Sequence, residues 1–253
     1  MLDTSAASKA GHRWQANKNR RRGRMNLQTA SGFDALDKAL LADALRMLEG
    51  AEMIDHSGHA SMRRDGRILI NDAVAPKRRL TVGDLVEIDA EGQRLAGAGR
   101  PPLEFHIHTE IYRQRPEVGA IIHLHPRWST LLTSVGAPYR PVFAQGALLG
   151  DIPVYDDPMS INTREAGAGL AAALGAGPAI LLKAHGATVV AEDLVTCFAL
   201  AAYLEENASR QVAAMGIGTP FVFDDGQRAR IRERLWSMGL FRKTWDHYHA
   251  RLG

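Results

Sequence analysis

Apolar side chains recur every three to four residues in three stretches, a spacing that places them on one face of a helix. We therefore predict helices over residues 33–49, 104–115 and 194–215. Gly50, Pro116 and Gly216 are each placed to end one of these helices, and Asp193 is a suitable N-cap for the third.

Short runs of β-branched and apolar residues predict strands over residues 67–71, 85–89, 118–125 and 179–185. Gly and polar residues interrupt residues 55–63 too often for a helix, so this segment is predicted to be an extended loop. No Pro- or Ser-rich linker follows residue 30. Residues 31–253 are therefore expected to form a single domain of layered α/β type.

The composition excludes several classes of protein. At 253 residues, 45% hydrophobic and 23% charged, the chain resembles an average globular protein and neither a disordered nor a fibrous one. It lacks an apolar run of about 20 residues, so no membrane partner is expected. The single cysteine, Cys197, excludes an internal disulfide and a cysteine zinc cluster, and is expected to be buried. A reducing, cytoplasmic location follows.

Positive charge is concentrated at the N-terminus. Residues 1–25 hold seven of the 31 Lys and Arg residues and one of the 28 acids, so the remaining 24 basic and 27 acidic residues leave −3. Residues 1–30 are expected to be a disordered extension. A start at Met25, an organelle presequence and binding to an anionic surface are the alternatives. Without a basic stripe after residue 30, nucleic acid is not expected as a partner.

Three histidines are placed to converge. His123 and His125 are separated by one residue on a predicted strand, so both side chains project from the same face. His185 lies at the end of another predicted strand, where Gly186 leaves it facing a cleft. Three imidazoles with one carboxylate or water complete a site for Zn²⁺, Mn²⁺ or Fe²⁺. We predict one divalent metal ion per subunit; partly exposed strand-end histidines are the alternative.

Several ordered motifs between residues 36 and 215 resemble the class II aldolase/adducin family. They are S-G-H-A-S-M-R at 57–63, P-L-E at 102–104, Y-R-Q-R-P at 112–116, V-G-A-I-I-H-L-H at 118–125 and L-L-K-A-H-G at 181–186. The resemblance implies a three-layer α/β/α sandwich with a largely antiparallel central sheet, assembled as a homotetramer with sites between subunits. It also implies that His123, His125 and His185 bind the metal, and that Glu104 is a fourth ligand or the catalytic acid/base.

The chain departs from the sugar-phosphate aldolases of this family at the phosphate-binding positions. Their loop reads G-N-x-S, their next turn carries Thr and Gly, and small hydroxyl residues precede the glutamate. Here His59 replaces the Asn, the turn at 71–76 reads N-D-A-V-A-P, and Pro102-Leu103 precede Glu104. Most hydroxyls that would cradle a phosphate are therefore missing.

The replacing residues suit a different substrate. His59, Ser61 and Arg63 are better matched to a planar carboxylate. The loop resembles a branch of the family that decarboxylates aromatic or pyridine dicarboxylates. We therefore expect a metal-dependent lyase that decarboxylates a small aromatic or heteroaromatic (hydroxy)carboxylic acid.

Decarboxylation and retro-aldol cleavage both leave a carbanion, which a Lewis-acidic cation stabilises as an enolate. Glu104 or its water is expected to supply the proton. Tyr248 either closes the site or packs, and His108, four residues after Glu104, either supports the site or packs. The alternatives are an aldolase, another metal enzyme (epimerase, dehydratase or iron oxygenase) and a non-catalytic module such as the adducin heads.

Overall fold

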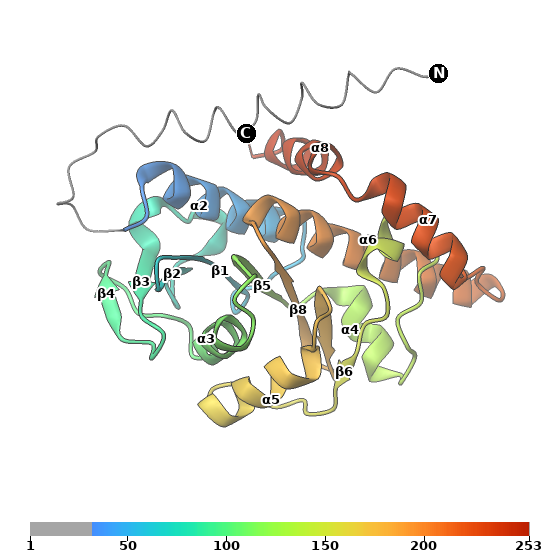
Figure 1. Ribbon diagram of the computed structural model, residues 1–253, viewed down its shortest axis with the longest axis horizontal. Helices are drawn as coiled ribbons and strands as arrows, with labels where there is room; N and C mark the ends of the chain where they lie inside the picture. Colours follow the sequence, from blue (N-terminus) through green and yellow to red (C-terminus); the bar gives the residue numbers. More distant parts are fainter. Residues whose placement is uncertain (1–31, 253) are drawn as a thin grey trace, which may run out of the picture. The chain divides into compact units, whose positions relative to one another are not determined.

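The computed structural model describes residues 32–252, so the predicted basic extension at residues 1–30 lies outside the described residues. Within them, eight strands form one sheet in the order β4-β3-β2-β1-β5-β8-β7-β6 (Figure 1). The strands are β1 His59–Arg64, β2 Arg67–Asn71, β3 Leu85–Ile88, β4 Arg94–Ala96, β5 Ala120–Leu124, β6 Val154–Tyr155, β7 Ala179–Leu182 and β8 Gly186–Ala191. Neighbouring strands are antiparallel except β6 and β7. The expected largely antiparallel sheet is confirmed.

Helices cover both faces of this sheet (Figure 1). They are α2 Ala35–Gly50, α3 Phe105–Gln114, α4 Arg127–Ser134, α5 Arg164–Leu174, α6 Leu194–Ile217, α7 Asp225–Leu235 and α8 Met238–His249, with 3₁₀ turns at Lys77–Arg79, Val82–Asp84 and Gln145–Leu149. One apolar core joins the sheet to α2, α6 and α8. A second core joins the opposite face to α3 and α5. The expected α/β/α sandwich is confirmed.

Strand β5 divides its side chains between the two cores. Ala120, Ile122 and Leu124 belong to the core on the α6 side, whereas Ile121 belongs to the core on the α3 side. Successive strand residues point to opposite faces, so His123 shares the face of Ile121. The strand therefore directs its histidine toward α3.

The segment predicted to be a loop is partly a strand. His59–Arg64 forms β1, which lies between β2 and β5 and pairs with both. The polar residues His59 and Ser61 are buried in this strand. They alternate with Ala60 and Met62, and their side chains hydrogen-bond to side chains of α3. A central strand with buried polar side chains lacks the run of apolar residues by which a buried strand is usually predicted.

The ends of the long helix were partly predicted. Asp193 caps α6 by accepting a hydrogen bond from the Thr196 N–H at 2.9 Å, as expected. The helix continues through Gly216 to Ile217, two residues beyond the predicted end. Gly218 caps it, and the Gly218 N–H still donates to the Ala214 carbonyl. Cys197 is fully buried in this helix, as predicted. In residues 32–252, no helix combines the length and apolar character needed to cross a membrane.

Candidate metal centre

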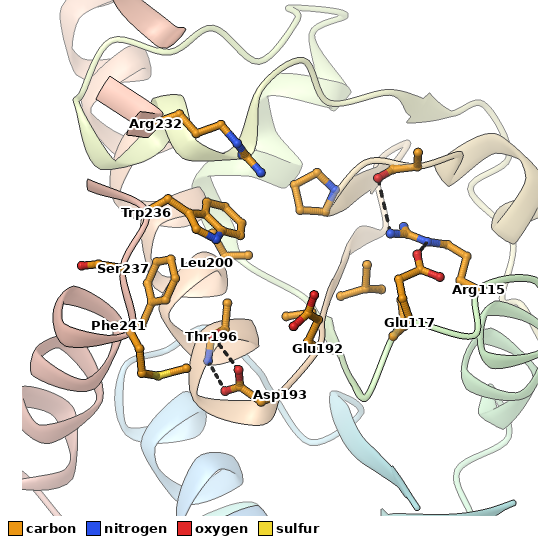
Figure 2. A pocket seen from close by; sticks show the side chains of 16 residues that line it. Arg115, Glu117, Glu192, Asp193, Thr196, Leu200, Arg232, Trp236, Ser237 and Phe241 are labelled. Carbon is orange, nitrogen blue, oxygen red and sulfur yellow. Dashed lines mark hydrogen bonds and ion pairs between the residues drawn. The ribbon is translucent and has the colours of Figure 1, made fainter. Parts of the chain in front are cut away.

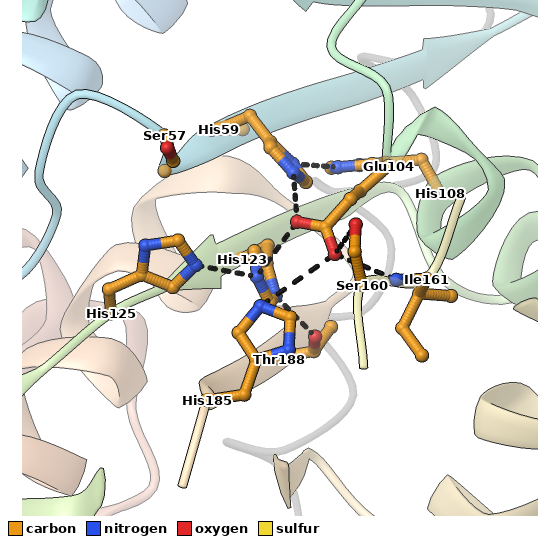
Figure 3. Close-up of polar contacts among 12 residues, drawn as sticks. Ser57, His59, Glu104, His108, His123, His125, Ser160, Ile161, His185 and Thr188 are labelled. Atoms are coloured by element: carbon orange, nitrogen blue, oxygen red, sulfur yellow. Dashed lines mark hydrogen bonds and ion pairs between the residues drawn. The ribbon is translucent and has the colours of Figure 1, made fainter. Parts of the chain in front are cut away.

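Four side chains converge at one end of the central strands β5 and β8 (Figure 3). His123 lies near the end of β5, and His125 follows that strand directly. His185 lies in the turn between β7 and β8, and Glu104 directly precedes α3. One ligand atom from each lies within 4.8 Å of the other three. The structure thus brings together the four residues expected to bind a metal.

Outer hydrogen bonds aim two imidazoles at the centre. His125 Nδ1 lies 2.9 Å from Asp55 Oδ1, and His123 Nδ1 lies 3.1 Å from Thr188 Oγ1. An ionised carboxylate only accepts, so His125 carries its proton on Nδ1 and turns the lone pair of Nε2 inward. Ligating histidines in metal sites are commonly oriented in this way.

Glu104 is held from behind by two donors. Its Oε1 accepts hydrogen bonds from the Ser160 hydroxyl at 2.9 Å and the Ile161 N–H at 2.8 Å. Burial alone would raise the pKa of Glu104, but the neighbouring His59 and the Ile161 N–H outweigh it and lower the pKa to about 2. Glu104 therefore faces the histidines as a carboxylate.

The donor set fits a divalent cation. His123 Nε2 lies 3.2 Å from His125 Nε2 and 3.6 Å from Glu104 Oε2, and His185 Nε2 lies 3.7 Å from Glu104 Oε1. Burial lowers the pKa of His123 and His185, which favours the neutral imidazole that binds metals. Three imidazoles and one carboxylate suit Zn²⁺, Mn²⁺ or Fe²⁺.

Two of the residues expected to bind substrate lie beside this centre but are buried. His59 is 1% exposed, stacks on His123 with ring centroids 4.8 Å apart, and places Nε2 3.7 Å from Glu104 Oε2. Ser61 is fully buried, and its hydroxyl contacts His108 at 2.6 Å and Tyr112 at 2.8 Å. Ser61 therefore supports its neighbours from within the core and does not face a substrate.

Arg63 and Tyr248 are placed differently from the expectation. The guanidinium of Arg63 donates to the carbonyls of Tyr112, Arg115, Pro116 and Val118, which lie at and beyond the end of α3. These carbonyls engage its terminal nitrogens, so within this chain Arg63 does not point toward the histidine cluster as expected. Tyr248 packs against Phe198 with ring centroids 5.3 Å apart and does not join the cluster within this chain.

A cavity of about 460 Å³ opens beside the centre. Its apolar walls come from Ala73, Val74, Pro101, Pro102 and Leu103, and its polar lining from His56, Ser57, His59, Arg100, Glu104 and Ser160. The positions at which the chain departs from the sugar-phosphate aldolases thus surround one space. Arg100 is exposed, and within residues 32–252 no carboxylate forms an ion pair with it.

A second cavity of about 400 Å³ lies at the opposite ends of β5 and β8 (Figure 2). Four of its five charged side chains already have partners within the chain, and only Glu192 has none among residues 32–252. Arg115 pairs with Glu117 at 2.8 Å, Asp193 caps α6, and Arg232 lies over the Trp236 ring at 3.9 Å. Groups that are paired with each other offer little to a ligand, so we assign the chemistry to the histidine end.

Sequence reasoning missed the residues that orient the ligands. Asp55, Thr188 and Ser160 are distant in sequence from the side chains they contact. Asp55 lies in the segment 55–63, beside the loop that the family resemblance places at the site, so a search for carboxylates in that segment could have found it. No local pattern distinguishes Thr188 from other strand threonines, or Ser160 from other loop serines.

Comparison with known proteins agrees with this architecture. Residues 39–212 match the Class II Aldolase and Adducin N-terminal domain. The chain is 30% identical over 203 residues to a 3,4-dihydroxyphthalate decarboxylase of Terrabacter sp. (74% of this chain, 85% of the relative). It is 29% identical over 187 residues to a 5-methylthioribulose-1-phosphate/5-deoxyribulose-1-phosphate aldolase of Rhodospirillum rubrum (72% and 83%).

A solved structure shares the fold over nearly the whole length. An aldolase II superfamily protein from Pseudomonas syringae superimposes with a TM-score of 0.78 at 20% identity, covering 93% of this chain and 96% of that chain. The sheet order, the site geometry and the matched residues 39–212 together place the protein: it belongs to the class II aldolase and adducin family.

Proposed function

We propose that the protein is a divalent-metal-dependent carbon–carbon lyase that decarboxylates a small aromatic or heteroaromatic hydroxycarboxylic acid. The observation that carries this proposal is the cavity beside Glu104, which combines apolar walls with one unpaired arginine. A planar ring would lie against Val74, Pro102 and Leu103, and Arg100 would bind its carboxylate through paired hydrogen bonds. The decarboxylases among the relatives support the same reaction.

The metal ligands in this proposal are His123, His125, His185 and Glu104. When bound, a divalent cation supplies Lewis acidity to a substrate oxygen and so lowers the energy of the carbanion. The protein fixes its ligands before substrate arrives, because Asp55, Thr188 and Ser160 hold three of them from behind.

Glu104 would move the proton. Glu104 is a carboxylate in this site, so Oε2 can accept the proton of a substrate hydroxyl. The bond to the carboxylate carbon then breaks, its electron pair stays on the ring, and CO₂ leaves. Glu104 returns its proton to that ring carbon, and water restores the hydroxyl proton. His59, which lines the same cavity, would hold a substrate oxygen through Nε2.

A sugar-phosphate aldolase is the second candidate. The hydroxyls of Ser57 and Ser160 line the same cavity, and Arg100 could bind a phosphate as well as a carboxylate. The Rhodospirillum rubrum relative, named as an aldolase, supports this possibility. The departures at residues 59, 71–76 and 102–103 favour the decarboxylase.

We also propose that the protein acts in the cytoplasm as a homo-oligomer, a tetramer in this family. Val74 and Leu103, at the cavity, are 69% and 79% exposed, and a second subunit over the cavity would bury them. Light scattering at micromolar concentration should give a mass of about four chains; a fully active monomer would refute this arrangement.

Substrate assays test the proposed reaction directly. The metal-loaded protein should release CO₂ from an ortho-hydroxylated aromatic dicarboxylate, and aldehyde release from a ketose 1-phosphate should be far slower. Arg100→Gln should raise KM for the dicarboxylate by about tenfold or more, the loss of one charge-assisted hydrogen bond. Arg78→Gln, a change in an exposed arginine paired with Glu49, is the matched control and should leave KM unchanged. Aldehyde release without CO₂ would establish the aldolase instead.

A further inference from the structure

A continuous chain of hydrogen bonds leads from the centre into the core. His59 Nδ1 lies 2.7 Å from His108 Nε2, His108 Nδ1 lies 2.6 Å from Ser61 Oγ, and Ser61 Oγ lies 2.8 Å from the Tyr112 hydroxyl. All four side chains are at most 4% exposed. We call this series the His59–Tyr112 chain. Figure 3 shows its outer end, where His59 lies between His108 and Glu104.

The fold supplies the alignment of this chain. His59 and Ser61 are two residues apart on β1 and therefore share a face, which is the face that α3 covers. His108 and Tyr112 are four residues apart on α3 and therefore also share a face. The strand pair and the helix pair interdigitate, so each side chain meets its neighbours from the opposite element.

The direction of the protons follows from the buried end. Within residues 32–252, the Tyr112 hydroxyl has Ser61 as its hydrogen-bond partner and no other. The phenolic hydrogen must therefore be donated to Ser61 Oγ, or it stays buried and unpaired. Ser61 then donates to His108 Nδ1, and His108 donates from Nε2 to His59 Nδ1. His59 is left with its own hydrogen on Nε2.

The reverse direction fails at both ends. It would leave the Tyr112 hydrogen without an acceptor in the core. It would also give His59 a lone pair on Nε2, facing the Glu104 carboxylate at 3.7 Å, where two electron-rich atoms repel each other. Buried networks in which every donor and acceptor is paired are strongly preferred over partly satisfied ones. Both ends therefore favour the same arrangement.

We propose that Tyr112, Ser61 and His108 act as positioning residues that hold neutral His59 as its Nε2–H tautomer, so that His59 donates a hydrogen bond into the cavity. A nitrogen that carries hydrogen cannot bind a cation. The chain therefore explains why His59, although stacked on His123, stays outside the metal ligands. It also makes His59 selective for a substrate oxygen that accepts, such as a carboxylate; this last consequence rests on the proposed function.

The tautomer can be observed without any assay of activity. We would label histidine with ¹⁵N in the full-length protein loaded with diamagnetic Zn²⁺ and measure long-range ¹H–¹⁵N correlations. His59 and His108 should each carry hydrogen on Nε2 in a ratio of at least about ten to one, as expected when the other form leaves a buried hydrogen bond unmade. A predominant Nδ1–H form of His59 would overturn the proposal, whether or not any variant folds.

Two tyrosine variants test the cause. Tyr112→Phe removes the hydroxyl that orders the buried end of the chain. It should raise the Nδ1–H share of His59, although Glu104 still favours Nε2–H, and should change the pH profile of kcat/KM. Tyr139→Phe is the matched control, because Tyr139 is also 4% exposed and bonds through its hydroxyl, but to the Gly146 carbonyl. It should leave both readouts unchanged.

The possible failures are distinguishable. If Tyr112→Phe leaves the tautomer ratio of His59 at its wild-type value, as Tyr139→Phe should, the chain does not help to set the tautomer and the proposal is wrong. If the tautomers follow the prediction but the protein releases no CO₂ from hydroxylated dicarboxylates, the proposed substrate class fails and the positioning role stands.

Discussion

The two ends of strands β5 and β8 carry cavities of similar size, about 460 and 400 Å³, but differ in how their polar groups are used. At the histidine end, one ligand atom from each of four side chains lies within 4.8 Å of the other three. At the opposite end, Arg115 and Asp193 are engaged by protein partners. Unpaired convergent groups, and not the volume of a cavity, identify the chemical site.

The burial of these groups strengthens the contrast. His123 is fully buried and Glu104 is 8% exposed. Water therefore solvates the carboxylate and the imidazoles only weakly in this place. A bound cation would compensate the carboxylate and bind the imidazoles together. The opposite end differs, because most of its charged side chains already have partners within the described chain.

Removal of a ligand should have the largest effect. His123→Ala deletes one of the four donors from a buried position, and turnover should fall by about a thousandfold or more together with metal content, as the Lewis acid is lost. Metal analysis and CO₂ release measure both. Glu192→Gln, at the rim of the opposite cavity, is the control and should retain both. If His123→Ala kept one equivalent of metal and full turnover, the histidine end would not be the metal site, and the proposed difference between the two ends would be wrong.

Removal of an outer partner should have an intermediate effect. Asp55→Asn keeps the shape of the side chain but removes the charge that holds His125 in its Nδ1–H form. Metal affinity should fall by about 10- to 100-fold, as for other outer-shell partners of ligating histidines. Competition with a chelator measures this change, and an unchanged affinity would mean that His125 is oriented by packing alone.

A change at the opposite end should affect stability and nothing else. Asp193→Ala removes the N-cap of α6 and should lower the free energy of unfolding by about 1 kcal/mol, or about 2–4 °C in Tm for a domain of this size. Urea unfolding measures the loss, and chelator competition should give the wild-type metal affinity. A weakened metal site in this variant would show that the two ends are coupled.

Local signals predicted part of the fold and three of the metal ligands, whereas the α/β/α sandwich was implied by family resemblance. Strands such as β2 and helices such as α6 follow apolar periodicity, and the spacing of His123 and His125 fixes a shared face. Family resemblance added Glu104. What sequence could not supply was contact over long separations: Asp55 meets His125 across 70 residues, and Thr188 meets His123 across 65.

Arg63 illustrates the opposite error. An arginine near the expected site suggested a group that binds a carboxylate. The sequence does not reveal that four carbonyls at and beyond the end of α3 lie within its reach. Strand β1 was missed for a related reason. Its inward side chains are His59 and Ser61, whose burial depends on partners from α3 and not on apolar character.

The central claim is that the histidine end holds one divalent cation on His123, His125, His185 and Glu104. Calorimetric titration of chelator-treated protein with Mn²⁺ or Zn²⁺ tests it most directly, because it counts sites without any assumption about substrate. We predict one equivalent bound per chain in the wild type, and none at the same concentrations after His123→Ala and His185→Ala are combined. The absence of binding in the wild type, or a full equivalent in the double variant, would contradict the account.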